Sequence, residues 1–179
     1  PNSKNHQAKQ FIDFGNWTLL GKTLERTKAS IFDAPVISTN KKYLKQIKQH
    51  LRKYKINNYK IVLEPAKRNT APAILSTALI KDIPDNQPLM FFSADHLIEK
   101  MSIFNKAINK NKKNLSDQNI FIFGIKPSSP SSEYGYFLTK KIKGNINKVT
   151  RFIEKPKEAK AKQIIKNKGY WNSGMFYLR

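Results

Sequence analysis

The chain has 179 residues, of which 39% are hydrophobic, and this is enough for one domain with a buried core. It contains no cysteine, which excludes disulfides, thiolate metal sites and cysteine nucleophiles, and its apolar runs are too short to span a bilayer. The net charge of +22 would attract phosphate-bearing partners, although the lysines lie in every segment and also fit a solvated surface. No signal peptide is visible, so we expect a cytoplasmic protein.

Residues 18–124 alternate between helix-like and strand-like segments. Apolar residues three and four apart predict helices over residues 18–27, 41–54, 71–79 and 101–108. Short continuous runs of Val, Ile, Leu and Phe predict buried parallel strands over residues 35–38, 60–63, 89–92 and 120–124. This order favours an α/β fold with a mixed, mostly parallel sheet that is flanked by helices and joined by right-handed crossovers.

After residue 124 the pattern changes. A loop rich in proline and serine is followed by predicted strands at 134–139 and 148–153, a helix at 157–168 and a strand at 174–178. The chain ends inside this last strand, and it does not open with a strand as an α/β sheet usually does. We therefore expect residues 1–179 to form one incomplete domain.

A carboxylate follows the strand predicted at residues 89–92. Asp95 and His96 are the first ionisable side chains after that strand. In open α/β sheets, ligands bind beyond the carboxyl ends of strands, and Mg²⁺ bound to phosphates takes one or two carboxylates from the protein. Asp95 is therefore a candidate Mg²⁺ ligand, with a capping or turn aspartate as the alternative. For His96, a packed or loop histidine is the better interpretation.

A second polar cluster surrounds the start of the helix predicted at residues 71–79. Thr70 is a candidate N-cap, and Pro72 suits the first helical turn, where its missing N–H costs nothing. Arg68 and the lysine before it could hold an anion beside the helix start. Glu64 only accepts hydrogen bonds when it is ionised, so it could take the ring N–H and the amino group of guanine. Capping alone also explains Thr70 and Pro72.

Two further motifs place polar groups next to predicted strands. Glu154 and Lys155 follow the strand at residues 148–153, where they could grip sugar hydroxyls and a phosphate, although an exposed ion pair is the simpler interpretation. Asn172 lies between aromatic residues and close to Gly174, which permits a close approach of the backbone to a ligand. A simple turn that enters a strand explains this motif equally well.

Five motifs, in this order and spacing, resemble the sugar-nucleotide pyrophosphorylase family. They match its mannose-1-phosphate guanylyltransferase branch most closely, including the forms fused to a mannose-6-phosphate isomerase activity. The motifs are LEPAKRNTAPAI, FFSADH, FGIKPSSPSSEYGYF, FIEKP and YWNSGMF. The resemblance runs from Pro1 to Arg179 and implies a Rossmann-like nucleotidyltransferase domain.

The resemblance also implies a role for each matching residue. Asp95 corresponds to the aspartate that binds Mg²⁺, while Lys9 and Lys155 correspond to lysines that meet phosphates, and these three would be the catalytic residues. The guanine nucleotide would be held by Glu64, Pro65, Arg68, Asn69 and Thr70. The mannose hydroxyls and the sugar phosphate would be held by Gly135, Glu154, Lys155 and Asn172.

The implied reaction is transfer of a guanylyl group from GTP to mannose-1-phosphate, which gives GDP-mannose and pyrophosphate. It requires alignment of two polyanions and neutralisation of their charge by Mg²⁺ and basic side chains, without a covalent enzyme intermediate. We therefore expect one cleft to be formed by the side chains of Glu64, Asp95, Glu154 and Asn172. The expected binding partners are GTP and mannose-1-phosphate. We expect no membrane partner and do not favour a nucleic-acid partner. Whether the protein forms a homo-oligomer stays open.

The sequence departs from the family at several points. Family members open with Gly-Gly-x-Gly-Thr-Arg, and Pro1-Asn2-Ser3-Lys4 would align with the tail of that signature. A second metal-binding aspartate and a C-terminal β-helix are also expected from the family and missing here. We therefore expect a chain truncated at both ends that transfers no guanylyl group by itself. Smaller departures are Ala8 and Ser93 for two usual prolines, and Glu133 for a small residue.

Three other functions stay open from the sequence. The first is a related nucleotidyltransferase with another base or sugar. The second is a non-catalytic nucleic-acid-binding protein driven by the positive charge, although the aromatic residues fall at core-like spacings rather than in the exposed stripes that stack bases. The third is a regulatory pseudoenzyme that kept the sugar site.

Overall fold

The computed structural model describes residues 8–66, 69–144 and 146–179, and the chain divides into two compact units. The first unit comprises the residues up to Asn119 together with Leu178 and Arg179, and the second unit comprises Ile120–Tyr177. Each unit combines strands with helices, which confirms the α/β class. The expectation of a single nucleotidyltransferase domain over residues 1–179 stays a prediction.

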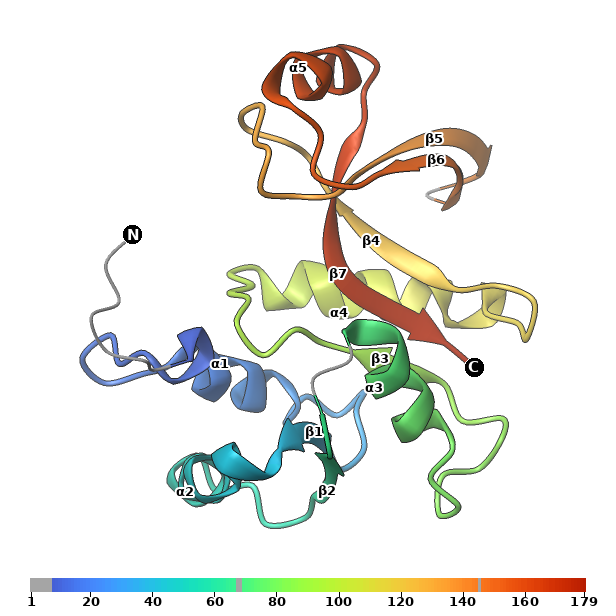
Figure 1. Ribbon diagram of the computed structural model, residues 1–179. Coiled ribbons are helices and arrows are strands. Elements are labelled where there is room, and N and C mark those ends of the chain that lie inside the picture. Colours follow the sequence, from blue (N-terminus) through green and yellow to red (C-terminus); the bar gives the residue numbers. More distant parts are fainter. Residues whose placement is uncertain (1–7, 67–68, 145) are drawn as a thin grey trace. The chain divides into compact units, whose positions relative to one another are not determined.

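A parallel pair of strands lies at the centre of the first unit. Strands β1 (Val36–Asn40) and β2 (Lys60–Glu64) pair in parallel, with Val36 opposite Lys60 and Asn40 opposite Glu64. Both strands therefore end at the same edge, as the sequence predicts (Figure 1). The other elements of this unit are η1 (Lys9–Phe11), α1 (Leu19–Arg26), η2 (Lys41–Tyr43), α2 (Leu44–Lys53), α3 (Thr70–Ala78), β3 (Leu89–Phe91), α4 (Met101–Asn111) and η3 (Lys112–Asn114).

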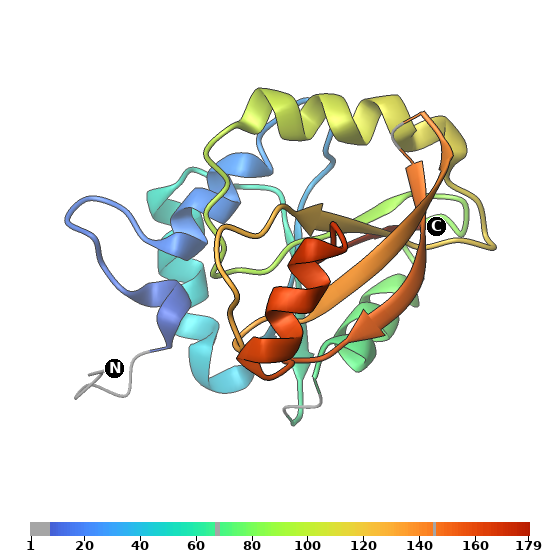
Figure 2. The same ribbon diagram turned by 90° about the horizontal axis from the view of Figure 1, so that it is seen from above.

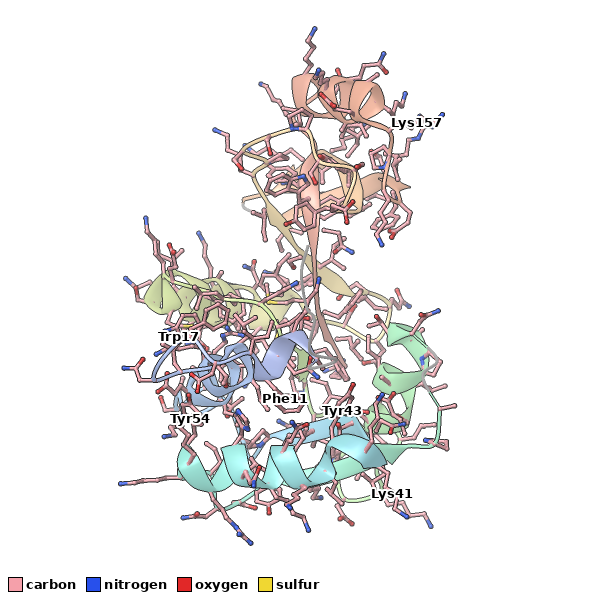
Figure 3. The ribbon with its side chains drawn as sticks, turned by 60° about the vertical axis from the view of Figure 1, so that its left-hand side comes forward. Phe11, Trp17, Lys41, Tyr43, Tyr54 and Lys157 are labelled. Carbon is pink, nitrogen blue, oxygen red and sulfur yellow. The ribbon has the colours of Figure 1, made fainter. Side chains whose placement is uncertain are left out.

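The main core of the first unit forms between η1, α1 and α2. Helix α1 begins after Thr18, whose hydroxyl accepts a 3.0 Å hydrogen bond from the backbone N–H of Gly21 and so caps the helix. Apolar side chains at helical spacing then meet across the two helices, and Figure 3 shows Phe11, Tyr43 and Tyr54 between these elements. The buried residues of this core are Phe11, Leu20, Leu24, Ile47, Leu51, Tyr54 and Ile56.

The strand pairings of the second unit are antiparallel. Strand β5 (Tyr136–Lys143) pairs with β6 (Ile146–Ile153) and with β7 (Tyr170–Leu178), and β4 (Phe121–Ile125) pairs with β7. The expectation of a parallel strand at residues 120–124 is therefore wrong, and within this unit the sheet is not mostly parallel. An apolar run shows that a strand is covered, but it does not show which partner the strand finds or in which direction that partner runs.

Helix α5 (Glu158–Lys166) covers one face of the β5–β6 hairpin, as Figure 2 shows. Its Ala161 and Ile164 form a small core with Tyr136, and Ile153 and Trp171 pack against this core. The last strand begins at Tyr170 rather than at residue 174, so Asn172 lies within a strand and not in a turn before one. Among the described residues, no helix is long and apolar enough to cross a membrane.

The packing of α1 against α2 gives a first prediction, at Gly21. A Cβ at this position would overlap the Cζ and hydroxyl of Tyr54, so Gly21→Ala forces the core to shift. Alanine is the better helix residue by about 1 kcal/mol, but overpacking costs about 1–3 kcal/mol, and we expect a net loss in the free energy of unfolding. Urea denaturation measures this loss, with Glu25→Ala on the exposed side of α1 as the control.

The double variant Gly21→Ala/Tyr54→Leu tests the cause of that loss. Leucine removes the ring atoms that the new methyl group meets, so the two changes together should cost less than the sum of their separate costs. Gly21→Ala that is as stable as the parent chain would contradict the packing described for this core.

Candidate functional site

Glu64 ends β2, and its carboxylate is held by the neighbouring strand. The hydroxyl of Ser38 donates a hydrogen bond of 2.5 Å to Glu64 Oε1, and Asn40 Nδ2 lies 3.4 Å from the backbone oxygen of Glu64. Each carboxylate oxygen has two lone-pair directions, so Glu64 can still accept hydrogen bonds from a ligand. The parallel register of β1 and β2 thus presents one oriented acceptor at the strand edge.

The segment after Glu64 leads into α3. Asn69 is the N-cap residue of this helix, with φ at +65° and without a capping hydrogen bond from its side chain, and Thr70 is the first helical residue. The prediction of Thr70 as the N-cap is therefore wrong by one position: Asn69, with φ at +65° and ψ at −167°, is the last non-helical residue, and Thr70 already belongs to the helix. Pro65 is exposed, and Arg68 lies outside the described residues.

Asp95 lies in the short segment that follows β3. Ser93 Oγ donates a hydrogen bond of 2.5 Å to Asp95 Oδ1, and His96 Nε2 lies 3.8 Å from the same oxygen. The side chain of Asp95 is 39% exposed, so solvent and ligands can reach it. Serine at position 93, where the family usually has proline, thus supplies a donor that proline could not.

This segment offers a metal ion one carboxylate, that of Asp95. Within residues 8–66, 69–144 and 146–179, no group of three His, Asp or Glu side chains could hold a metal ion by itself. Mg²⁺ commonly keeps several waters and is bound by one or two carboxylates plus the phosphates of a substrate. A single accessible aspartate fits that mode of binding and does not fit an all-protein metal cage.

Lys9 lies on η1 and is exposed, while two residues later Phe11 is buried in the core of the first unit. Phe11 thus anchors the short turn that carries Lys9.

Arg26 is a residue near Asp95 that the sequence analysis missed. It belongs to α1 and is only 4% exposed. Its Nη2 donates a hydrogen bond of 3.0 Å to the backbone oxygen of His96. The only sequence signal for a buried Arg26 is its place in the last turn of an amphipathic helix, close to the buried residues Thr23 and Leu24. Such a charge is usually explained by the helix dipole.

In the second unit, strand register brings three predicted residues together. Tyr136 of β5 lies opposite Ile153 on one side and Trp171 on the other, so one step along the strand Gly135 faces Glu154 and Asn172. The backbone N–H of Asn172 donates a 2.7 Å hydrogen bond to the Gly135 oxygen. A Cβ at Gly135 would lie only 3.0 Å from Glu154 Oε2, so glycine leaves room for this carboxylate against the backbone.

Two backbone features shape the surroundings of this cluster. Lys155 has φ at +38°, an uncommon value for a residue with a side chain, and it directly follows Glu154. The side-chain oxygen of Asn172 accepts a 3.2 Å hydrogen bond from the N–H of Gly174, whose φ is +68°. The Asn172 side chain is thus held in place, while Lys155 stays exposed.

Aromatic side chains from β5, from β7 and from the loop before β5 lie beside the same cluster. The ring of Trp171 lies 4.9 Å from the Tyr134 ring and 6.4 Å from the Tyr136 ring, centre to centre. The Tyr136 hydroxyl donates to the backbone oxygen of Ser131 and accepts from its N–H, each at 2.9 Å. Tyr136 is fully buried, so it ties the loop before Gly135 to the sheet.

The predicted site residues therefore fall into two groups. The first unit holds Lys9, Glu64, Pro65, Asn69, Thr70 and Asp95, and the second unit holds Gly135, Glu154, Lys155 and Asn172. The convergence of both groups on one cleft stays a prediction.

Comparison with known proteins identifies relatives for nearly the whole chain. The model of the nucleotidyl transferase family matches residues 4–179. A mannose-1-phosphate guanylyltransferase of Klebsiella pneumoniae is 33% identical over 187 residues, which cover 100% of this chain and 40% of that protein. The alginate biosynthesis protein AlgA of Pseudomonas aeruginosa is 32% identical over 186 residues, covering 100% of this chain and 38% of that protein.

Solved structures show the same likeness in three dimensions. The crystal structure of a mannose-6-phosphate isomerase from Helicobacter pylori has a TM-score of 0.81 at 31% identity, over 96% of this chain and 65% of that one. The chain spans between 38% and 40% of the length of the two curated relatives named above.

The loop that Tyr136 holds gives a second prediction. Tyr136→Phe removes a hydroxyl that makes two hydrogen bonds and leaves the N–H and oxygen of Ser131 without that partner. We expect the free energy of unfolding to fall by about 1–3 kcal/mol. Thermal and urea unfolding measure this change, and Tyr134→Phe, in the same loop but 47% exposed, is the matched control. Equal stability of the two variants would contradict the proposed anchoring of the loop.

Proposed function

Because the chain belongs to the nucleotidyl transferase family, we propose that it serves the transfer of a guanylyl group from GTP to mannose-1-phosphate. An oxygen of the sugar phosphate attacks the α-phosphorus of GTP, the bond from that phosphorus to the bridging oxygen breaks, and pyrophosphate leaves. The product is GDP-mannose. Two observations support this choice. The Klebsiella pneumoniae relative is named a mannose-1-phosphate guanylyltransferase, and the second unit contains the cluster of Gly135, Glu154 and Asn172.

The sugar phosphate is assigned to the second unit. Glu154 offers two carboxylate oxygens to sugar hydroxyls, beside a glycine whose missing side chain leaves the backbone open to a ligand. Lys155, which is exposed and next in sequence, supplies a positive charge for the phosphate. The cluster of Gly135, Glu154 and Asn172 is the single observation that carries the proposal, because strand register rather than chance proximity brings it together.

The guanine base is assigned to the first unit. Guanine presents a ring N–H and an amino group side by side, and one carboxylate can accept both hydrogen bonds. Glu64, oriented by Ser38, is such an acceptor. Adenine lacks this pair of adjacent donors, so the same carboxylate would discriminate against ATP.

The charged groups of GTP are assigned to Asp95 and to the exposed lysines. Asp95 would hold Mg²⁺, which supplies charge neutralisation on the phosphates when it is bound. Lys9 would lie against the triphosphate, and Lys155 against the attacking phosphate. These side chains bind and align two anions, and the reaction requires no protein nucleophile.

The sugar assignment predicts a signal from Trp171. The chain has two tryptophans, and the variant Trp17→Phe leaves Trp171, next to Asn172, as the only one. Titration of this variant with mannose-1-phosphate should change its fluorescence. Glu154→Gln should weaken binding at least about tenfold, because a hydrogen bond to a charged group contributes about 1.5–3 kcal/mol.

The matched control for Glu154→Gln is Glu133→Gln, which changes an exposed carboxylate in the neighbouring loop and should leave the affinity unchanged. Glucose-1-phosphate and inorganic phosphate, added in parallel titrations, separate recognition of the sugar from attraction of the phosphate alone. Equal affinities for all three ligands would refute the sugar assignment.

The base assignment predicts a selective effect at Glu64. Glu64→Gln keeps the size of the side chain but replaces one acceptor oxygen with a donor, so GTP binding should weaken by about tenfold or more while ATP binding changes little. Isothermal titration with both nucleotides measures the ratio, and Glu99→Gln, an exposed change in the same unit, is the control. If Glu64→Gln weakens GTP and ATP binding equally, Glu64 does not read the base.

A further inference from the structure

Arg26 contacts the chain on both sides of Asp95. Its Nη2 donates a 3.0 Å hydrogen bond to the backbone oxygen of His96, the residue after Asp95. Its guanidinium carbon lies 5.2 Å from the centre of the Phe92 ring, within the range of a cation–π interaction. Seventy positions separate Arg26 from His96 along the chain, so this contact is a product of the tertiary fold.

The charge of Arg26 is poorly compensated by the protein. Among the described residues, its buried Nε and Nη1 have no hydrogen-bond acceptor, and none of the ion pairs includes it. Burial lowers the pKa of the guanidinium from its ordinary value. A buried charge without a partner costs free energy, and a well-packed apolar residue in its place is often neutral or stabilising. Packing alone therefore does not explain an arginine at this position.

The segment held by Arg26 carries a carboxylate that is already oriented on one side. Ser93 donates to Asp95 Oδ1, which fixes the side chain relative to the residue two positions before it. The hydrogen bond from Arg26 fixes the peptide group that follows Asp95. One contact restrains the Asp95 carboxylate, and the other restrains the peptide group that follows this residue.

We infer that Arg26 is a positioning residue for the metal-binding carboxylate of Asp95. By holding the His96 carbonyl against α1, it keeps Asp95 in the orientation that binds Mg²⁺ on a nucleotide, and it places a buried positive charge one hydrogen bond from that segment. This inference rests on the proposed function, because it takes Asp95 as the Mg²⁺ ligand. Residues that orient a metal ligand from outside the coordination shell affect metal affinity by about 10–100-fold.

The test measures how strongly Mg²⁺ increases the affinity of the protein for GTP. Isothermal titration gives the Kd of GTP with Mg²⁺ and with EDTA, and the ratio of the two values is the Mg²⁺ factor. Arg26→Lys keeps the positive charge but loses the planar fork and its fit over Phe92. We expect it to lower the Mg²⁺ factor by about tenfold, with the Kd for GTP in EDTA little changed.

Two controls separate positioning from general damage to the fold. Arg52→Lys, an exposed change on α2, should leave the Mg²⁺ factor as it is in the parent chain. The affinity of Arg26→Lys for mannose-1-phosphate, measured through Trp171, should also be unchanged. If Arg26→Lys weakens all ligands equally, its role is structural only and the inference is overturned.

Asp95→Asn distinguishes failure of this inference from failure of the proposed function. The role proposed for Asp95 is contradicted if Mg²⁺ does not increase the GTP affinity of the parent chain. It is also contradicted if the Asp95→Asn variant keeps the full Mg²⁺ factor. If Asp95→Asn abolishes the factor while Arg26→Lys retains it, only the role of Arg26 is refuted.

Phe92→Leu provides the test if Arg26→Lys does not fold. It removes the ring beneath the guanidinium and keeps an apolar side chain in its place. The loss of a cation–π interaction of about 0.5–1 kcal/mol should lower the Mg²⁺ factor by about two- to fivefold. An unchanged factor in Phe92→Leu would then overturn the inference.

Discussion

The strand register that sets Gly135 opposite Glu154 and Asn172 is the constraint on which the candidate sugar site depends. A Cβ at position 135 would lie 2.9 Å from Cζ of Phe152 and 3.0 Å from Glu154 Oε2, so a larger residue there would displace the ends of both side chains. The absence of a Cβ lets a carboxylate, a peptide group and the amide of Asn172 occupy neighbouring positions. The hydrogen bond from Asn172 to Gly135 then fixes β7 against β5 at this point.

The two units hold their acidic residues by related means. In the first unit, serine hydroxyls donate to the carboxylates of Glu64 and Asp95, and in each case the serine lies on the same sheet or segment as its partner. In the second unit, strand register places Glu154 opposite Gly135, whose missing side chain leaves room for the carboxylate. In the first unit the carboxylates are thus oriented before a ligand arrives, so binding need not order them.

Much of this could be predicted from the sequence, because the strands and helices follow local patterns. The runs at residues 35–38, 60–63 and 89–92 and the helices between them appear within a few residues of their predicted bounds. The family resemblance also assigned Gly135, Glu154 and Asn172 to one sugar-binding group, and strand register brings these three residues together. The antiparallel pairing of β4 was missed, because a covered strand has the same apolar pattern whichever way its partner runs.

The contacts that depend on tertiary structure could not be predicted in this way. The hydrogen bond from Arg26 to His96 joins residues far apart in sequence, and no local pattern marks an arginine that will be buried. The start of α3 was displaced by one residue, because Thr70 is already helical and Asn69 is the cap, and local sequence does not distinguish these two polar residues as caps. Ser93 looked like a departure from the family, and only its geometry showed that it donates to Asp95.

Amide chemical-shift mapping with mannose-1-phosphate tests the account most directly. Bound sugar phosphate should shift the amide signals of Gly135, Lys155 and Asn172 in the second unit, and Glu154→Gln should reduce these shifts at the same ligand concentration. Shifts confined to surface lysines far from these residues, or shifts that inorganic phosphate reproduces at the same concentration, would contradict it.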